Sequence, residues 1–135
     1  SSECTNCGAG KSLSDAASDA SKHDAEGDCV GCELGKSSLA GSSFCSVCPA
    51  GKYADAIGST CSNCAEGKYL NDAATSPSLH DAEVDCAICG AGKYANVAGT
   101  ATCSNCAEGK YLNDAATSPS LHDAEVDCAM WCRQV

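Results

Sequence analysis

Cysteine is the residue type whose number and spacing in this chain could do chemistry. The 135-residue chain has 14 cysteines. They stand in seven close pairs, six of them Cys-x2-Cys, while the last pair, Cys128 and Cys132, is separated by one residue more. Paired cysteines of this kind form disulfides, bind zinc or carry out thiol–disulfide exchange.

Zinc binding and redox catalysis fit this spacing less well than disulfides do. A four-cysteine zinc site uses cysteines in fours, and 14 leaves two over. A redox enzyme needs one special pair in a β–α–β setting, whereas the seven pairs of this chain are nearly equivalent. Cysteine above about a tenth of all residues is typical of a disulfide scaffold in an oxidising compartment. We therefore expect disulfides and a secreted or extracellular protein.

A second motif, His-Asp-Ala-Glu-x-Asp-Cys, begins at His23, His80 and His122. Its alternating acids could place carboxylate oxygens on one side for Ca²⁺, helped by Asn71 or Asp72. The alternative is a solvated acidic loop in which the histidine caps a turn or covers a disulfide. The calcium hypothesis concerns Asp81, Glu83, Asp85, Asp123, Glu125 and Asp127.

The arrangement of these residues does not indicate a catalytic site. No serine or cysteine nucleophile with a paired base can be identified. A histidine repeated three times is more often structural than catalytic. We expect a protein that is not an enzyme and that needs no cofactor, calcium aside.

Hydroxyl residues flank Pro77 and Pro119, a composition typical of O-glycosylated stalks. An ordinary exposed turn is the alternative. The candidate O-glycosylation sites, with glycans as partners, are Thr75, Ser76, Ser78, Thr117, Ser118 and Ser120.

The chain is built from internal repeats. Residues Cys61 to Ala87 recur letter for letter at Cys103 to Ala129, an offset of 42, and a looser copy begins at Cys4. Such an array consists of small units that stack because none can bury a core alone. We predict one continuous array over 1–135, with long modules at 4–29, 64–86 and 106–128, short modules at 32–45, 48–61 and 89–103, and a C-terminal joint at 129–135.

Composition excludes several other classes of protein. Aromatic residues make up only 4% of the chain, so burial alone cannot repay the chain entropy lost on folding, and cross-links must replace a core. The net charge of −10 argues against nucleic acid as a partner, since phosphate contacts need clustered Lys and Arg. No apolar run reaches the length of a membrane span. The chain starts without an initiator Met, so we expect that a targeting peptide has been removed or left out.

Local sequence predicts little regular secondary structure. Each glycine before a lysine should sit in a turn with positive φ, and Lys-Tyr should start a short extended segment. Residues 54–60 should form a turn and a return strand, completing a small hairpin. In the long modules Ser76 should be the N-cap, and Pro77 the first residue, of one helical turn.

The segment Cys48-PAGKYADAIGST-Cys61 resembles the first disulfide loop of tumour-necrosis-factor-receptor cysteine-rich domains. Tandem Cys-x2-Cys-x2-Gly-Lys-Tyr units resemble ephrin-receptor-like repeats, and the resemblance covers residues 4–132. It implies a small disulfide-rich repeat protein, an elongated rod of stacked cysteine-rich modules with short β-hairpins. Such repeats serve as stalks, ligand-binding ectodomains and extracellular fibres. Because the long modules depart from the receptor pattern, no ligand site is carried over.

Fourteen cysteines allow on the order of 10⁵ pairings. The resemblance implies a sequential ladder, in which the second cysteine of each pair bonds the first cysteine of the next. The main alternative is a crossed pattern, first to third and second to fourth. The ladder would join Cys7 to Cys29, Cys32 to Cys45, Cys48 to Cys61, Cys64 to Cys86, Cys89 to Cys103 and Cys106 to Cys128.

We expect a non-enzymatic extracellular structural protein, a disulfide-laddered rod that is the subunit of a filament or stalk at the cell surface. The alternative is a ligand-binding ectodomain fragment of a receptor or adhesin. The ladder leaves over Cys4 and Cys132, which could join copies head to tail with Trp131 buried at the joint. Residues 1–135 cut from a longer array would equally leave both cysteines unpaired.

Overall fold

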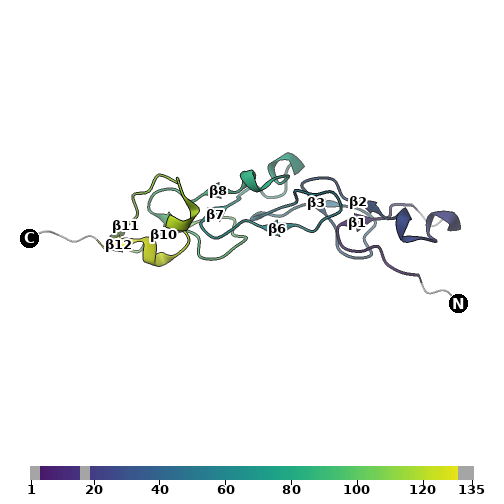
Figure 1. The fold of residues 1–135 in the computed structure, drawn as a ribbon, viewed down its shortest axis with the longest axis horizontal. Coiled ribbons are helices and arrows are strands. Elements are labelled where there is room, and N and C mark those ends of the chain that lie inside the picture. The colour runs from purple at the N-terminus through teal and green to yellow at the C-terminus, as the bar shows by residue number, and fades with distance from the viewer. Residues whose placement is uncertain (1–3, 16–18, 131–135) are drawn as a thin grey trace, which may run out of the picture. The chain divides into compact units, whose positions relative to one another are not determined.

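The computed structural model describes residues 4–15 and 19–130, and regular structure among them consists only of two-residue strands and three-residue 3-10 turns (Figure 1). The strands are β1 (Lys11–Ser12), β2 (Val30–Gly31), β3 (Lys36–Ser37), β4 (Ser46–Val47), β5 (Lys52–Tyr53), β6 (Ser62–Asn63), β7 (Lys68–Tyr69), β8 (Ala87–Ile88), β9 (Lys93–Tyr94), β10 (Ser104–Asn105), β11 (Lys110–Tyr111) and β12 (Ala129–Met130). The turns are η1 (Ala20–Lys22), η2 (Glu26–Asp28), η3 (Pro77–Leu79), η4 (Glu83–Asp85), η5 (Pro119–Leu121) and η6 (Glu125–Asp127). The expected scarcity of regular secondary structure is confirmed.

Each strand that starts at a Gly-Lys turn pairs with the two residues that follow the first cysteine of the next pair. In β7 and β8, for example, Lys68 lies opposite Ile88 and Tyr69 opposite Ala87 in antiparallel register. The sheets are β1–β2, β3–β4, β5–β6, β7–β8, β9–β10 and β11–β12. The prediction that Lys-Tyr starts an extended segment is confirmed.

The return strand predicted within residues 54–60 is wrong. The partner of β5 is β6, which begins at Ser62 and therefore follows Cys61. Residues 54–60 instead form a loop whose backbone contacts an earlier part of the chain, since the Gly58 amide donates to the Cys32 carbonyl at 2.9 Å. The loop binds neighbouring modules through Ala54 and Gly58 and closes on itself through the Ser59 amide, which donates to the Ala56 carbonyl at 3.3 Å.

The glycine before each lysine has positive φ, as predicted. The φ values lie between 74° and 83° at Gly10, Gly35, Gly51, Gly67, Gly92 and Gly109. A side chain would strain this backbone conformation.

Six disulfides close the modules, with Cα atoms 5.7 to 5.9 Å apart. They join Cys7 to Cys29, Cys32 to Cys45, Cys48 to Cys61, Cys64 to Cys86, Cys89 to Cys103 and Cys106 to Cys128. This is the order of the sequential ladder and not of the crossed pattern.

The chain forms two compact units, and their boundaries fall inside modules. The first unit comprises Ser1–Cys48, Tyr53–Cys61 and Ala74–Ala82, and the second comprises Pro49–Lys52, Ser62–Ala73 and Glu83–Val135. The buried side chains of the first unit include Cys7, Cys32, Cys48, Ala54 and His80. Those of the second include Cys64, Leu70, Cys86, Cys89, Ala95, Leu112, His122 and Cys128. Within each unit, disulfides and a few small or aliphatic side chains take the place of a large apolar core.

A backbone hydrogen bond links each Gly-Lys turn to the next one along the chain. The glycine amide donates to the carbonyl of the residue two places after the next module's lysine. In the first unit these bonds are Gly10 to Ser38 (2.9 Å) and Gly35 to Ala54 (2.8 Å). In the second unit they are Gly51 to Leu70 (2.8 Å), Gly67 to Ala95 (2.8 Å) and Gly92 to Leu112 (2.7 Å). Because only backbone atoms take part, the bond recurs whatever the side chains are.

The same glycines also contact the module after the next. A Cβ atom at Gly67 would collide with the carbonyl oxygen of Pro119, and one at Gly35 would collide with that of Pro77. Gly10 approaches the Gly58 carbonyl, and Gly51 the Gly99 carbonyl, in the same way. At these four turns glycine is required twice, by the positive φ and by the close approach of a backbone carbonyl.

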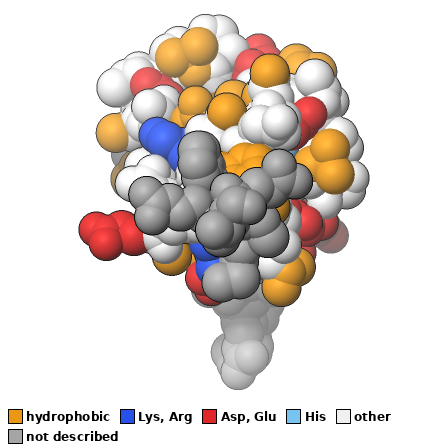
Figure 2. Space-filling view, turned by 90° about the vertical axis from the view of Figure 1, so that its left-hand side faces the viewer, with side chains coloured by type: hydrophobic (Ala, Val, Ile, Leu, Met, Phe, Trp, Pro, Cys, Tyr) orange, Lys and Arg blue, Asp and Glu red, His pale blue; other side chains and the backbone are white. Residues whose placement is uncertain are grey.

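The surface carries acidic side chains and scattered hydrophobic ones, with few basic ones on the side that Figure 2 shows. The lysines of the long modules each bind a glutamate fifteen residues further on: Lys11 to Glu26 (3.3 Å), Lys68 to Glu83 (3.0 Å) and Lys110 to Glu125 (3.4 Å). These lysines are therefore parts of the scaffold. No helix among the described residues is long and apolar enough to cross a membrane.

Candidate functional site

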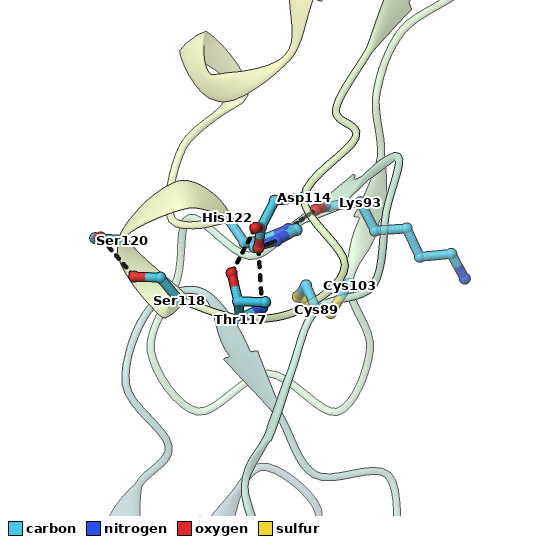
Figure 3. A network of polar contacts seen from close by, with 8 residues as sticks. All are labelled: Cys89, Lys93, Cys103, Asp114, Thr117, Ser118, Ser120 and His122. Atoms are coloured by element: carbon cyan, nitrogen blue, oxygen red, sulfur yellow. Dashed lines mark hydrogen bonds and ion pairs between the residues drawn. A yellow bond between two sulfur atoms is a disulfide. The ribbon is translucent and has the colours of Figure 1, made fainter.

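The side chain of His122 is a fully buried polar group, 0% exposed (Figure 3). It follows η5, whose last residue is Leu121. Its Nδ1 lies 2.8 Å from the backbone carbonyl of Lys93, and its Nε2 lies 2.9 Å from Oδ2 of Asp114. Both ring nitrogens therefore have a partner.

Both partners of His122 are hydrogen-bond acceptors. The carbonyl of Lys93 can only accept, and an ionised Asp114 also only accepts. The ring of His122 is therefore held between two acceptor oxygens, one from an earlier hairpin and one from its own module.

Asp114 is held in its ionised form by the turn that follows it. The hydroxyl of Thr117 donates to Oδ1, and the Thr117 amide donates to Oδ2 at 2.9 Å. These bonds, with the smaller contribution of His122, lower the pKa of Asp114 from 3.8 to about 2. Ala116, with a φ of 61°, precedes Thr117 in a left-handed conformation that turns the chain back towards Asp114.

The first repeat makes part of the same arrangement with a more exposed ring. His23 Nε2 lies 2.8 Å from Asp15 Oδ2, and the His23 side chain is 30% exposed. His80, in the second copy, is 0% exposed. An aspartate stands eight residues before each of the three histidines, at Asp15, Asp72 and Asp114. That spacing is the signal that could have identified Asp15 and Asp114 as histidine partners, a role that the sequence analysis missed.

The carboxylates of the calcium hypothesis are dispersed among separate partners. Glu83 and Glu125 bind Lys68 and Lys110, and Oδ2 of Asp127 accepts the Ala124 amide at 2.9 Å. Glu83–Asp85 and Glu125–Asp127 form the 3-10 turns η4 and η6. Over residues 4–15 and 19–130, no three His, Cys, Asp or Glu side chains are grouped so that they could hold a metal ion.

The hydroxyl tract lies at the surface, at the start of η3 and η5. Ser76 and Ser118 are the N-caps, and a proline is the first residue of each turn, as predicted. The cap hydroxyls do not bind the turn's amides, because Ser76 Oγ pairs with Ser78 Oγ and Ser118 Oγ with Ser120 Oγ, both at 2.9 Å. Thr75, Ser78, Thr117 and Ser120 are all exposed, and the hydroxyl of Thr117 donates to Asp114.

Of the two cysteines that the ladder leaves without a partner, the structure describes only Cys4. Cys4 is exposed and has no disulfide partner among the described residues. Cys132 and Trp131 lie outside the described residues, and so does the joint predicted for them.

A small hollow in the second unit has a volume of about 340 Å³. It is lined by Tyr69, Asn71, Gly90, Ala91, Lys93, Thr102 and Cys103. The only cationic side chain among them is Lys93, and the Cys103 sulfur is in a disulfide, so this lining offers no nucleophile with a paired base.

Ladder disulfides, recurring two-residue hairpins and histidines fixed by backbone and carboxylate contacts define the class: this is a small disulfide-rich protein built of cysteine-rich repeats. Its disulfides are typical of secreted and extracellular proteins. No protein-family model and no curated protein sequence matches the chain.

Proposed function

We propose that this protein is a non-enzymatic extracellular structural protein, a disulfide-laddered rod that serves as the subunit of a cell-surface filament or stalk. The observation that carries the proposal is the order of the six disulfides. Each bond closes one module with the first cysteine of the next pair, so every loop is spanned by a second covalent path. Such a chain resists extension, because a pulling force meets a disulfide in every module.

The series of consecutive modules supports the proposal that they belong to the ephrin-receptor-like and tumour-necrosis-factor-receptor-like repeats. Every module opens with Gly-Lys in a positive-φ turn followed by a short strand, which is the feature on which the resemblance rests. A structural role also suits the buried histidine, since His122 has both nitrogens engaged and none left to move a proton to a substrate.

A head-to-tail disulfide between Cys132 of one copy and Cys4 of the next would extend the ladder. In the ladder the second cysteine of each pair bonds the first cysteine of the following pair, and Cys132 and Cys4 hold those two positions. The exposure of Cys4 supports its role as the acceptor of this bond. O-glycans on Thr75, Ser78 and Ser120 would shield the surface, and the exposure of these residues supports that role.

A binding module is the second candidate, and exposed apolar side chains of one short module favour it. Leu39 is 81% exposed and Phe44, the only phenylalanine, is 67% exposed. A ligand-binding ectodomain of a receptor or adhesin would use such side chains as anchors.

Non-reducing electrophoresis together with negative-stain electron microscopy of protein from its native source separates the two candidates. The structural role predicts a series of multimers that reduction collapses to one band near 13.5 kDa, and filaments on the grid. Monomers on a non-reducing gel and discrete short particles on the grid would refute the filament. Substitution of Cys4 by Ser should abolish the covalent multimers, whereas Ser43→Ala, a change at another exposed position, should leave them unchanged.

A further inference from the structure

The hollow in the second unit brings together polar side chains that have no partner within the described part of the chain. Tyr69, Asn71, Lys93 and Thr102 are among the residues that line its volume of about 340 Å³. The phenol, carboxamide, ammonium and hydroxyl groups of these four residues make no hydrogen bond or ion pair with another described residue. The ring of His122, by contrast, has both of its nitrogens engaged. Ligand pockets begin at roughly 300 Å³, so the hollow has the size and the polar groups for one small ligand.

Backbone contacts fix the two walls of the hollow against each other. One wall is the end of β7 with the residues that follow it, and the other is β9 with its loop. The Leu70 amide of the first wall donates to the Thr100 carbonyl of the second at 3.3 Å, and the disulfide of Cys103 closes the second wall. Figure 3 shows the Lys93 side chain extended away from the His122 ring that holds its carbonyl. The polar groups therefore project from a backbone that is ordered before a ligand arrives, which lowers the cost of binding.

Lys93 gives the hollow a positive charge that no carboxylate neutralises. Its lining contains this one lysine and no aspartate or glutamate, in a chain with a net charge of −10. In the short module 32–45, Lys36 binds Glu33, three residues before it, at 3.5 Å. Gly90 stands at that place before Lys93, and the short module 89–103 has no 3-10 turn to supply a glutamate. The lysines that do bind a glutamate of their own long module are Lys11, Lys68 and Lys110.

The corresponding place in the first unit has a different set of side chains. Ser12 Oγ lies 3.3 Å from Cys45 Sγ, so the equivalent two segments meet there as well. The three other polar side chains of the hollow are replaced there by Ser12, Ser14 and Phe44, and the lysine is already paired. The group of unpaired polar side chains is therefore a property of the hollow in the second unit and not of the repeat in general.

We propose that this hollow binds one acidic sugar unit of a glycan. The ammonium group of Lys93 pairs with the carboxylate or sulfate of the sugar, which carries one charge. A phosphate monoester carries nearly two and is repelled more strongly by an acidic chain. The Asn71 carboxamide and the hydroxyls of Tyr69 and Thr102 both donate and accept hydrogen bonds, as sugar hydroxyls do. The Tyr69 ring offers an apolar face to the C–H groups of the sugar ring.

This binding activity goes beyond the proposed structural function and does not depend on it. All the residues that line the hollow belong to the second unit, so binding needs neither a filament nor a second copy. A monomeric protein that binds acidic sugars would support the site and refute the filament. Filaments that bind no acidic sugar would support the structural function and overturn the site.

The test is a titration of the full, disulfide-bonded, ¹⁵N-labelled chain with methyl glucuronide and with glucose 6-sulfate at matched ionic strength. These two probes distinguish a carboxylate from a sulfate, and methyl glucoside is the neutral control. We expect saturable shifts of the Asn71, Lys93 and Thr102 amide signals with at least one acidic sugar, with a Kd on the order of 1 mM. Methyl glucoside should give no saturable shift below about 20 mM.

Gly90→Glu is the most specific variant, because it places a carboxylate where Glu33 stands relative to Lys36. A Cβ atom at Gly90 would meet nothing within 4 Å, and Gly90 is not one of the glycines with positive φ, so the fold should accept the change. Gly90→Glu and Lys93→Gln should each weaken binding by at least about tenfold. The matched control, Lys36→Gln, removes a paired lysine outside the hollow and should leave the Kd unchanged. Unchanged amide signals outside the hollow would show that each variant keeps the fold.

Three results would overturn the proposal. The first is the absence of a saturable shift with either acidic sugar up to about 20 mM. The second is equal binding of methyl glucoside or of inorganic phosphate, because the charge or the sugar ring would then be irrelevant. The third is equal weakening by Lys36→Gln and Lys93→Gln, which would assign the attraction to surface charge in general and not to the hollow.

Discussion

At the scale of single residues, His122 shows how a repeat with a small core fixes a loop. The ring is inserted between the Lys93 carbonyl, which belongs to an earlier hairpin, and the Asp114 carboxylate, which belongs to its own module. Its own carbonyl accepts the Ala95 amide at 2.7 Å. Through its side chain and its backbone carbonyl, His122 thus connects three stretches of the second unit by hydrogen bonds. A protein with a larger core would use an apolar side chain for this purpose.

Asp114 makes this arrangement sensitive to acid. Its pKa falls from 3.8 to about 2 on folding, so the folded state holds fewer protons than the unfolded chain between these values. The stability that the carboxylate contributes is complete above pH 3.8 and is lost as the pH falls towards 2. We expect the urea midpoint of the unaltered protein to fall over this range more steeply than that of Asp114→Asn.

The control for this prediction is Asp55→Asn, since Asp55 is exposed and has no hydrogen bond or ion pair among the described residues. It should follow the unaltered protein at every pH. Thr117→Ala removes the largest cause of the lowered pKa, so its acid response should lie between those of the unaltered protein and Asp114→Asn. A parallel decline of all four proteins would contradict the role assigned to Asp114.

A second prediction at the residue scale concerns the stability lost when a glycine of a Gly-Lys turn is replaced by alanine. Gly67→Ala should destabilise the fold by more than about 2 kcal/mol, because the left-handed backbone strain is joined by a clash with the Pro119 carbonyl. Gly109→Ala has the same strain, with φ at 80°, but its Cβ would meet no atom of the described residues within 4 Å, so it should cost only about 1–2 kcal/mol. Chemical unfolding of dilute protein measures both. Equal losses would mean that φ alone, and not packing, demands glycine at Gly67.

At the scale of elements, each hairpin is too short to be stable by itself and depends on the disulfide that closes it. Two-residue strands contribute few ladder bonds, and an isolated two-stranded hairpin is marginal in water. In the chain-entropy model each bond therefore provides most of the stability of its module.

Removing one disulfide should cost nearly the same in a long and in a short module. The double change of Cys64 and Cys86 to Ala opens a loop of sequence separation 22, and that of Cys32 and Cys45 one of 13. Loop-closure entropy predicts losses of about 3 kcal/mol each, differing by only about 0.5 kcal/mol. Urea unfolding of the two variants measures the difference. A much larger loss in the long module would show that its 3-10 turns depend on the bond for more than chain entropy.

The sequence predicts the elements of this fold better than their contacts. Gly-Lys-Tyr correctly predicts a turn and a strand, because positive φ and β-propensity are local properties. Ser76 and Pro77 correctly predict the start of η3, the first of the two 3-10 turns of its long module. The return strand was misplaced because residues 54–60 bind the preceding module, and nothing local in that loop records this long-range contact.

For the candidate site too, the sequence predicts a local feature but not the long-range contacts. A structural role for the histidine could be predicted from its threefold recurrence, but not its partners. Asp114 lies eight residues away in sequence and the Lys93 carbonyl 29, and a backbone carbonyl leaves no mark in a sequence. The approach of Pro119 to Gly67 is equally invisible, because any residue offers a carbonyl.

At the scale of the whole molecule, covalent cross-links and repeated backbone contacts carry the stability that an apolar core provides elsewhere. Leu70, Leu112, Ala54 and Ala95 are the buried aliphatic side chains of the described residues, and most larger apolar ones are exposed. This composition leaves little hydrophobic free energy to oppose chain entropy once the disulfides are cut.

The protein should therefore unfold on reduction and withstand chelation. With reductant, the chain loses roughly 3 kcal/mol for each of the six disulfides, or about 18 kcal/mol together, which exceeds the roughly 5–15 kcal/mol by which most domains are stable. Amide signals in a ¹H–¹⁵N spectrum should therefore collapse to the narrow range of an unfolded chain. With EGTA the spectrum should not change, because Glu83, Glu125 and Asp127 have protein partners and the described residues form no metal cluster. Reductant followed by re-oxidation serves as the control for reversible unfolding. Collapse in EGTA with the disulfides intact would contradict this account and make the acidic motif a calcium site on which the fold depends.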